Sequence, residues 1–223
     1  MGKRLIITII IVCYVMCLCS CFNSASTLED CFFCVYSIVS SSDARYDSIG
    51  SAFWMNNRII TNAHIVSYLD DGERMVHESI IAKPYNSNNE IELQIETIDY
   101  EKDIAILTAI DENYSPSMNL RFGETCRLEI GDTLFAIGNL NNYGLCCNTG
   151  ILSAQKKTIF NNNTYNEYYQ TNIEISKGSS GGPVLNKDYE VVGIMTFKVR
   201  DLNSEYVDGM SFFIPIESVI NSL

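Results

Sequence analysis

The chain is 223 residues long, 47% hydrophobic and 19% charged, which is ordinary for a globular protein large enough to bury a core. Its formal net charge at pH 7 is -12, and no cluster of Lys and Arg offsets that charge. Because an acidic surface repels phosphate backbones, nucleic acid is excluded as a partner.

The first 22 residues differ in character from the rest. Met1–Arg4 is basic and Leu5–Phe22 is almost wholly apolar, which is the pattern of an export signal or of a membrane anchor that is retained. The segment Leu18–Cys21 resembles a bacterial lipobox, in which Cys21 would carry a lipid after cleavage. The alternative is cleavage near Ala25 and simple secretion. Either reading predicts an exported protein, tethered to the cell envelope through its N-terminus or secreted.

Residues 23–30 are predicted to be a polar spacer, and residues 31–223 to be an all-β domain. Short runs rich in β-branched and aromatic residues, separated by turn-forming residues, indicate a barrel or sandwich. We expect strands at Phe33–Ser40, Ile49–Met55, Arg58–Thr61, Ile91–Ile98, Ile104–Ile110, Thr133–Ile137, Gly150–Ala154, Tyr168–Ile173, Val184–Leu185, Tyr189–Phe197 and Met210–Ile214. Asp111–Asn119 is expected to connect two groups of strands, Asn161–Asn166 to be a mobile loop, and only Pro215–Leu223 to be a helix.

Five cysteines follow the apolar leader, and an odd number cannot all pair within one chain. They are Cys31, Cys34, Cys126, Cys146 and Cys147. The Cys31-x-x-Cys34 pair has no second pair to complete a zinc site, so buried thiols or one structural disulfide are favoured. No motif predicts a metal ion or an organic cofactor.

Three polar residues stand at positions that suit nucleophilic catalysis. Ser180 lies in a glycine-rich turn between apolar runs, and a serine needs a base before it can act as a nucleophile. His64 directly follows an expected strand, whereas His77, in a charged segment, is expected to be solvated. Asp103 begins the most apolar strand and could hold the imidazole.

With their neighbours, these residues resemble the motifs of chymotrypsin-fold (trypsin-like) serine peptidases of the HtrA/Deg type. The matching segments are Thr-Asn-Ala-His at Thr61–His64, Asp-Ile-Ala-Ile-Leu at Asp103–Leu107 and Gly-x-Ser-Gly-Gly-Pro at Gly178–Pro183. The resemblance runs from about Cys31 to Val219. It implies two six-stranded antiparallel β-barrels, at about 31–115 and 120–215, with a short C-terminal helix and an active site between the barrels.

The resemblance also implies roles for individual residues. Ser180 would be the nucleophile, His64 the general base, and Asp103 the group that orients the imidazole. The loop Gly178, Ser179 and Ser180 would form the oxyanion hole through the N–H groups of Gly178 and Ser180.

Two residues of the strand after the nucleophile, Thr196 and Phe197, would contact substrate, and Thr196 could also donate to Asp103. Glu174 lies six residues before Ser180, where trypsin-like enzymes place the base of the primary pocket. There it would favour Lys or Arg before the cleaved bond. The alternative, which we favour, is that Glu174 points to solvent and the pocket is small and apolar.

The sequence departs from the family pattern in two places. Ser179 stands where trypsin-like digestive enzymes carry Asp and HtrA-type enzymes usually carry Asn. The PDZ domain usual in HtrA proteins is expected to be missing. The sequence therefore predicts a serine endopeptidase acting on proteins or peptides, or alternatively a latent or non-catalytic protein of the same fold that binds unfolded or partner proteins. No feature specifies an oligomeric state.

Overall fold

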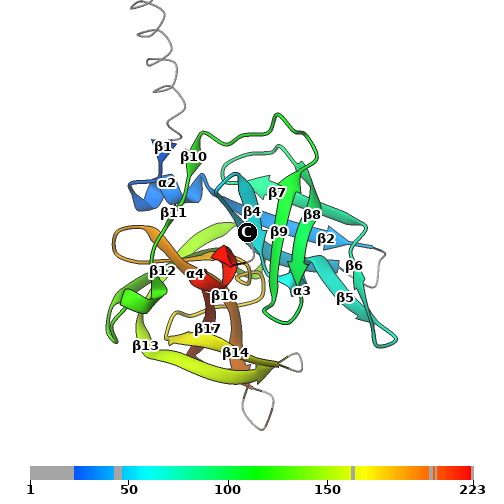
Figure 1. The fold of residues 1–223 in the computed structure, drawn as a ribbon. Helices are drawn as coiled ribbons and strands as arrows, with labels where there is room; N and C mark the ends of the chain where they lie inside the picture. The colour runs from blue at the N-terminus through cyan, green and yellow to red at the C-terminus, as the bar shows by residue number, and fades with distance from the viewer. Residues whose placement is uncertain (1–22, 43–46, 162–163, 201–202, 204, 222–223) are drawn as a thin grey trace, which may run out of the picture.

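Two rings of β-strands make up most of the computed structural model, which describes residues 23–221 apart from 43–46, 162–163, 201–202 and 204 (Figure 1). The expected export signal and Cys21 lie outside the described residues. Among the residues that are described, no helix is long and apolar enough to cross a membrane.

The first ring is a closed antiparallel barrel of six strands in the order β2-β3-β4-β9-β8-β7. Its strands are β2 (Val35–Ser41), β3 (Asp47–Met55), β4 (Arg58–Thr61), β7 (Ser79–Pro84), β8 (Ile91–Asp99) and β9 (Ile104–Ala109). The first half of β8 alternates between buried and exposed side chains, whereas the first four residues of β9 are all buried. Alternating and continuous apolar patterns in the sequence therefore correspond to half-buried and fully buried strands.

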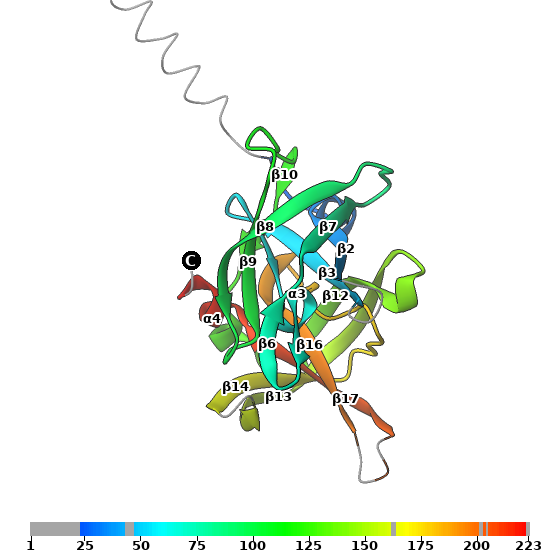
Figure 2. The same cartoon turned by 90° about the vertical axis from the view of Figure 1, so that its right-hand side faces the viewer.

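The second ring contains six strands in the order β16-β15-β12-β13-β14-β17, and β17 pairs back onto β16. They are β12 (Thr133–Asn139), β13 (Leu145–Asn161), β14 (Thr164–Thr171), β15 (Pro183–Leu185), β16 (Glu190–Arg200) and β17 (Tyr206–Pro215). A short strand, β11 (Arg121–Phe122), adds to the edge of β16. Figure 2 shows the β16–β17 hairpin extending beyond the rest of this ring. The predicted fold of two six-stranded antiparallel rings is confirmed.

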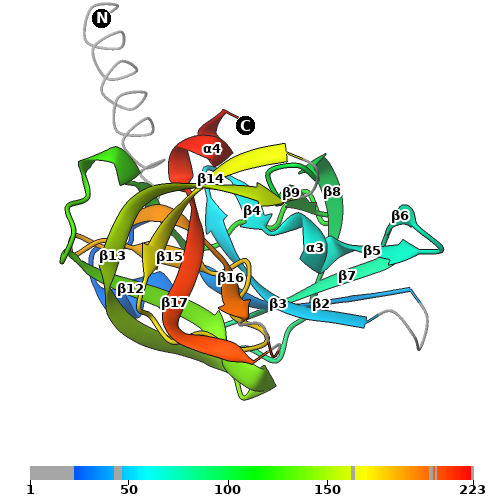
Figure 3. The same ribbon diagram turned by 90° about the horizontal axis from the view of Figure 1, so that it is seen from below.

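Short elements connect and flank the rings. They are β1 (Asn23–Ser24), α2 (Leu28–Phe32), α3 (Ala63–Val66), β5 (Ser67–Asp70), β6 (Glu73–Val76), β10 (Met118–Asn119), the 3₁₀ turns η1 (Thr125–Arg127) and η2 (Leu140–Asn142), and α4 (Ile216–Ile220). The β5–β6 hairpin projects from the first barrel (Figure 3). The strand β1 pairs in parallel with β10, so the start of the described chain is attached to the connector between the rings.

Several expectations for local structure were wrong. The spacer at 23–30 contains β1 and the start of α2, where Thr27 and Asp30 form a capping box. Helices of four or five residues are too short to give a periodic signal, so α2 and α3 were missed along with β5, β6 and β7. In the Asn-rich tract, which was expected to be a mobile loop, Asn161 ends β13 and Thr164–Asn166 begin β14, with Asn161 paired with Thr164; residues 162–163 lie outside the described chain.

His77 is buried rather than solvated, with an exposed fraction of 5%. It follows β6, and its backbone N–H donates to Val66 O at 3.0 Å. The ring packs on Tyr68 at a centroid distance of 4.9 Å. Burial lowers the pKa of His77, so its neutral form is favoured in the folded protein.

All five cysteines in the described chain are free thiols. Cys31 and Cys34 are fully buried, and burial raises the pKa of each to about 12. Of the two readings favoured by the sequence, the structure therefore has buried thiols at these positions. Because the thiolate is the reactive form, neither is a nucleophile at neutral pH.

Candidate active site

Two residues predicted to be catalytic, His64 and Ser180, line one cleft of about 490 Å³ between the two rings. His64 lies in α3 on the first ring, and Ser180 in the loop between β14 and β15 of the second. The third, Asp103, lies just before β9 and is buried behind His64. A short helix, a loop and the start of a strand, from distant parts of the chain, therefore bring an imidazole, a hydroxyl and an acid together at one cleft.

The carboxylate of Asp103 holds the imidazole of His64 from two directions. His64 Nδ1 lies 2.8 Å from Asp103 Oδ2 and 3.0 Å from Oδ1, and the His64 backbone N–H donates to Oδ1 at 3.0 Å. The expected hydrogen bond from Thr196 Oγ1 to Asp103 Oδ2 is present at 2.9 Å. The side chain of His64 is 48% exposed. With Nδ1 bound to the acid, Nε2 is the nitrogen left to exchange protons in the cleft.

The charge of Asp103 changes the proton affinity of His64. Burial lowers the pKa of His64, but the charge of Asp103 and its hydrogen bond outweigh this, so that the pKa lies above its ordinary value of 6.5. The pair therefore stabilises the imidazolium, which is the form produced when His64 accepts a proton.

The backbone of Asp103 adopts a left-handed conformation, with φ of 59°. Asn62, which is fully buried, donates from Nδ2 to the Asp103 carbonyl oxygen at 2.9 Å and so helps to hold this uncommon conformation. Asn62 was missed as a site residue, although it stands inside the Thr-Asn-Ala-His motif that was used to find His64.

The peptide group between Lys177 and Gly178 has a fixed direction. The Lys177 carbonyl oxygen accepts the Asn141 N–H at 2.7 Å. In a trans peptide the C=O and N–H groups point in opposite directions, so the Gly178 N–H faces away from Asn141. Gly178 has φ of 93°, and a Cβ there would overlap the carbonyl oxygen of Asn139. Glycine is therefore required at this position on grounds of both conformation and space.

The peptide group between Ser179 and Ser180 is held in the same manner. The Ser179 carbonyl oxygen accepts the Gly182 N–H at 3.2 Å, so the Ser180 N–H points the other way. Within the described chain, neither this N–H nor that of Gly178 donates to another protein group. Two unpaired N–H donors beside a cleft-lining hydroxyl are the components of an oxyanion hole.

Ser179, the middle residue of the expected oxyanion loop, uses its own N–H within the loop. Its N–H donates to the Ser176 carbonyl oxygen at 3.0 Å, and its Oγ accepts the Ser176 N–H at 3.2 Å. The side chain is buried and serves the loop rather than the cleft.

Ser51, a fully buried residue of β3, links the first barrel to this loop and was not identified from the sequence. Its Oγ donates to the Gly178 carbonyl oxygen at 2.7 Å and accepts the Asn139 N–H at 2.8 Å. Its backbone N–H donates to the Ser180 carbonyl oxygen at 2.8 Å. One residue of the first barrel thus fixes two carbonyl groups that flank the candidate oxyanion hole.

Asn139, at the end of β12, shapes the turn that carries Asn141. Its Oδ1 accepts the Gly144 N–H at 2.9 Å, and its Nδ2 donates to Asn142 Oδ1 at 3.1 Å. Both Asn141 and Asn142 have positive φ, which asparagine tolerates better than most residues. The turn η2 is therefore a second support for the Lys177–Gly178 peptide.

The hydroxyl of Ser180 is bonded to a backbone group. Ser180 Oγ donates to the Thr196 carbonyl oxygen at 2.8 Å. Among the interactions of the described residues, none joins this hydroxyl to His64.

Of the three residues expected to contact substrate, two line the cleft and one does not. Thr196 and Phe197 line the cleft, whereas Glu174 is not among its lining residues. The Glu174 carboxylate lies 2.8 Å from Lys198 Nζ, and Lys198 does line the cleft. The Glu174 side chain is 58% exposed, so it points largely to solvent, as we favoured, while its carboxylate pairs with a lysine of the cleft wall.

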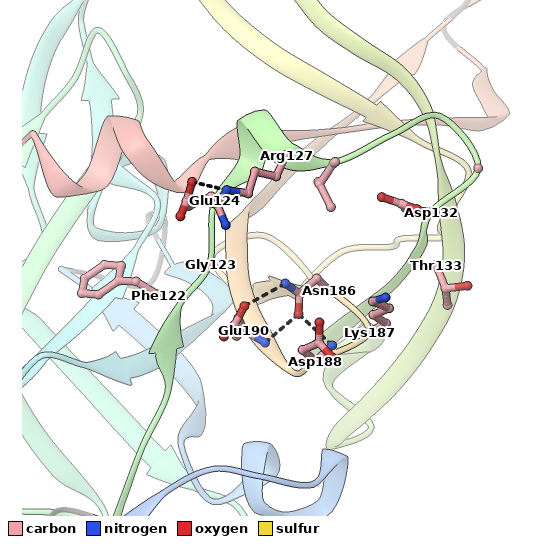
Figure 4. Close-up of a pocket in the computed structure, with 12 residues that line it drawn as sticks. Phe122, Gly123, Glu124, Arg127, Asp132, Thr133, Asn186, Lys187, Asp188 and Glu190 are labelled. Carbon is pink, nitrogen blue, oxygen red and sulfur yellow. Dashed lines mark hydrogen bonds and ion pairs between the residues drawn. The ribbon is translucent and has the colours of Figure 1, made fainter.

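A second hollow, of about 580 Å³, lies on the second ring and shares no residue with the cleft (Figure 4). Several of its charged and polar residues form ion pairs and hydrogen bonds with one another. Arg127 pairs with Glu124 at 2.6 Å, and Asn186 Oδ1 accepts the N–H groups of Asp188 and Glu190, each at 2.9 Å. These contacts hold a turn in place and bring no nucleophile or base together. Within the described part of the chain, no group of three His, Cys, Asp or Glu residues could hold a metal ion.

Comparison with known proteins identifies peptidases similar to this chain. The model of the trypsin-like peptidase domain family matches residues 50–194. A probable periplasmic serine endoprotease DegP-like from Pseudomonas putida (strain W619) is 31% identical over 176 residues, which is 78% of this chain and 34% of that protein. Serine endoprotease DegS from Haemophilus influenzae is 28% identical over 186 residues, 81% of this chain and 51% of that protein.

Solved structures of HtrA-type proteases are similar to this chain in fold. The structure of the HtrA-type protease AlgW with a tripeptide superposes with a TM-score of 0.74 at 26% identity, covering 87% of this chain and 60% of that chain. An AlgW variant carrying the substitution S227A, also with a tripeptide, gives a TM-score of 0.74 at 25% identity, covering 88% of this chain and 60% of that one. This chain spans 34% of the length of the first relative and 51% of the second.

Proposed function

Because the chain belongs to the trypsin-like peptidase domain family, we propose that it is an exported serine endopeptidase that cleaves protein chains through Ser180, His64 and Asp103. The observation that carries this proposal is the direction of the peptide groups at Gly178 and Ser180. Both leave an N–H without a protein partner beside a hydroxyl, next to a histidine held by a buried acid.

In the proposed mechanism, Ser180 first exchanges one hydrogen bond for another. Its Oγ now donates to the Thr196 carbonyl oxygen, and rotation about the Cα–Cβ bond would turn it towards His64 Nε2. Hydrogen bonds in the active sites of unliganded enzymes commonly become aligned only when substrate binds.

The rotated Oγ attacks the carbonyl carbon of the peptide bond while His64 Nε2 takes its proton. The resulting oxyanion accepts hydrogen bonds from the N–H groups of Gly178 and Ser180, and Asp103 stabilises the imidazolium. His64 then gives the proton to the leaving amine as the C–N bond breaks, which leaves an acyl group on Ser180. A water molecule, deprotonated by His64, attacks that acyl group, and Ser180 leaves with the proton.

Export is supported by the basic and apolar pattern of residues 1–22 and by the word periplasmic in the names of relatives. Protein or peptide substrates are supported by peptidase structures that were solved with a tripeptide. A lipid on Cys21 would tether the domain to the envelope.

One observation favours a second candidate, a latent protein that binds chains without cutting them. In the structure Ser180 donates to Thr196 rather than to His64. An activator would then be needed to turn the hydroxyl.

Digestion of an unfolded protein separates the two candidates. We expect the full chain to cut reduced, denatured casein, and Ser180→Ala to leave it intact. Binding of the casein by the wild type without cleavage would favour the latent protein.

A further inference from the structure

A lysine of this chain extends into the wall of the cleft beside Ser180. The cleft is lined there by Ile175–Lys177 on one side and by Thr196–Lys198 on the other. The side chain of Lys198 is only 9% exposed, although both of its partners are more open to solvent. A substrate residue whose carbonyl oxygen is bound by the N–H groups of Gly178 and Ser180 would have its side chain in the cleft that Lys198 also lines.

The ammonium group of Lys198 is held by two carboxylates. Its Nζ lies 2.8 Å from Glu174 Oε2 and 2.9 Å from Asp208 Oδ1. The hydrogen bonds with Glu174 and then Asp208 raise the pKa of Lys198, so the group stays protonated at neutral pH. The buried stem fills space with methylene groups while the charge stays with its partners.

The side chain and backbone of Glu174 accept hydrogen bonds from residues of three strands. Besides pairing with Lys198 of β16, its Oε1 accepts the N–H of Gly209 in β17 at 3.4 Å. Its backbone oxygen accepts Asn148 Nδ2, from β13, at 2.6 Å. The backbone of Glu174 is therefore fixed beside Lys198, and if the lysine were removed the 58% exposed carboxylate would keep its bond from the Gly209 N–H.

We propose that Lys198 determines the substrate preference of the peptidase by occupying the place of a basic substrate side chain. The inference rests on the proposed function. Because the lysine stem fills the pocket and its ammonium group already pairs with Glu174, the pocket admits small uncharged side chains and rejects Lys and Arg. The two carboxylates also outnumber the ammonium group, so they would oppose an acidic side chain, although weakly because Glu174 and Asp208 are 58% and 89% exposed.

The test compares peptides that differ only in the residue before the cleaved bond. Ala, Met, Lys, Arg and Glu are placed there in turn, and kcat/KM is measured for the full chain and its variants. Active enzyme is counted by titration with a fluorophosphonate probe. The wild type is expected to prefer the Ala peptide over the other four.

Variants at Lys198 and Glu174 separate the effect of the space that the lysine stem fills from the effect of the Glu174 charge. Lys198→Ala opens the pocket to Glu174, so kcat/KM for the Lys peptide relative to the Ala peptide should rise by about tenfold to a hundredfold. Adding Glu174→Gln should remove most of that gain. Lys198→Met, the matched control, keeps a stem of similar length and should reject the Lys peptide as the wild type does.

Efficient cleavage of the Lys or Arg peptide by the wild type would overturn the inference even if Lys198→Ala did not fold. So would unchanged preferences in a probe-reactive Lys198→Ala variant. A wild type that does not react with the probe would overturn the proposed function and this inference with it. Probe reactivity thus distinguishes the two failures.

Discussion

Ser51 Oγ in the first barrel donates a 2.7 Å hydrogen bond to the carbonyl oxygen of Gly178 in the second. The two residues are 127 positions apart in the sequence. The same hydroxyl accepts the Asn139 N–H, so it connects both segments that orient the Lys177–Gly178 peptide. The geometry of the proposed oxyanion hole therefore depends on how the two barrels pack.

Replacing Ser51 by Ala is expected to lower kcat while leaving KM nearly unchanged. The Gly178 carbonyl and the Asn139 N–H would each lose a buried partner, so the Lys177–Gly178 peptide would keep its bond to Asn141 but lose the support on either side of it. Loss of one oxyanion donor costs about a hundredfold to a thousandfold, so a misdirected donor should cost roughly tenfold to a hundredfold. Steady-state kinetics on a peptide substrate measure the change.

Ser40→Ala is the matched control for Ser51→Ala. Ser40 is a fully buried serine of the neighbouring strand β2, and its Oγ has no hydrogen-bond partner among the described residues. Removing that hydroxyl should leave kcat unchanged. Equal losses of kcat in the two variants would contradict a positioning role for Ser51.

Gly178→Ala is expected to abolish most activity without unfolding the protein. A Cβ there would overlap the Asn139 carbonyl oxygen, so the peptide that carries the Gly178 N–H must rotate. We expect kcat to fall by about a hundredfold or more. Gly131→Ala provides the control, because Gly131 has a similar φ of 98° with nothing within 4 Å of the added Cβ. Both variants carry backbone strain of about 1–2 kcal/mol, and only Gly178→Ala should lose activity.

Activity is expected to rise with pH through a midpoint above 6.5. His64 must be neutral to accept the proton of Ser180, and its pKa lies above the ordinary value of 6.5 because of Asp103. In Asp103→Asn the charge that raises the pKa is gone, so the midpoint should move to lower pH while kcat falls by about ten-thousandfold. The profile of kcat/KM against pH reports these values for the free enzyme. A midpoint below 6.5 in the wild type would contradict the role given to Asp103.

Sequence patterns predicted the parts of this protein that depend on local composition. The continuous apolar run at Ile104–Leu107 became a buried strand and Asp103 stands directly before it as expected, whereas His64, expected at a strand end, lies in the short helix α3 that follows β4. Periodicity and turn residues carry that information because strand formation and strand ends are encoded within a few neighbouring residues.

The remaining features depend on contacts between residues far apart in the chain. Nothing near Ser51 in the sequence indicates a bond to Gly178. Glu174 was found from its spacing to Ser180, but its partner Lys198, on another strand, determines whether its charge is available. His77 was misread because the charged residues around it give no sign of the packing against Tyr68 that buries its ring.

We propose that Ser180 is a nucleophile beside a formed oxyanion hole. Reaction of the purified full chain with a fluorophosphonate probe, followed by intact mass and peptide mapping, tests it directly. We expect one adduct per chain, located on Ser180 and absent from both Ser180→Ala and His64→Ala. A correctly folded wild type that forms no adduct, or forms it on another residue, would show that Ser180 is not an activated nucleophile.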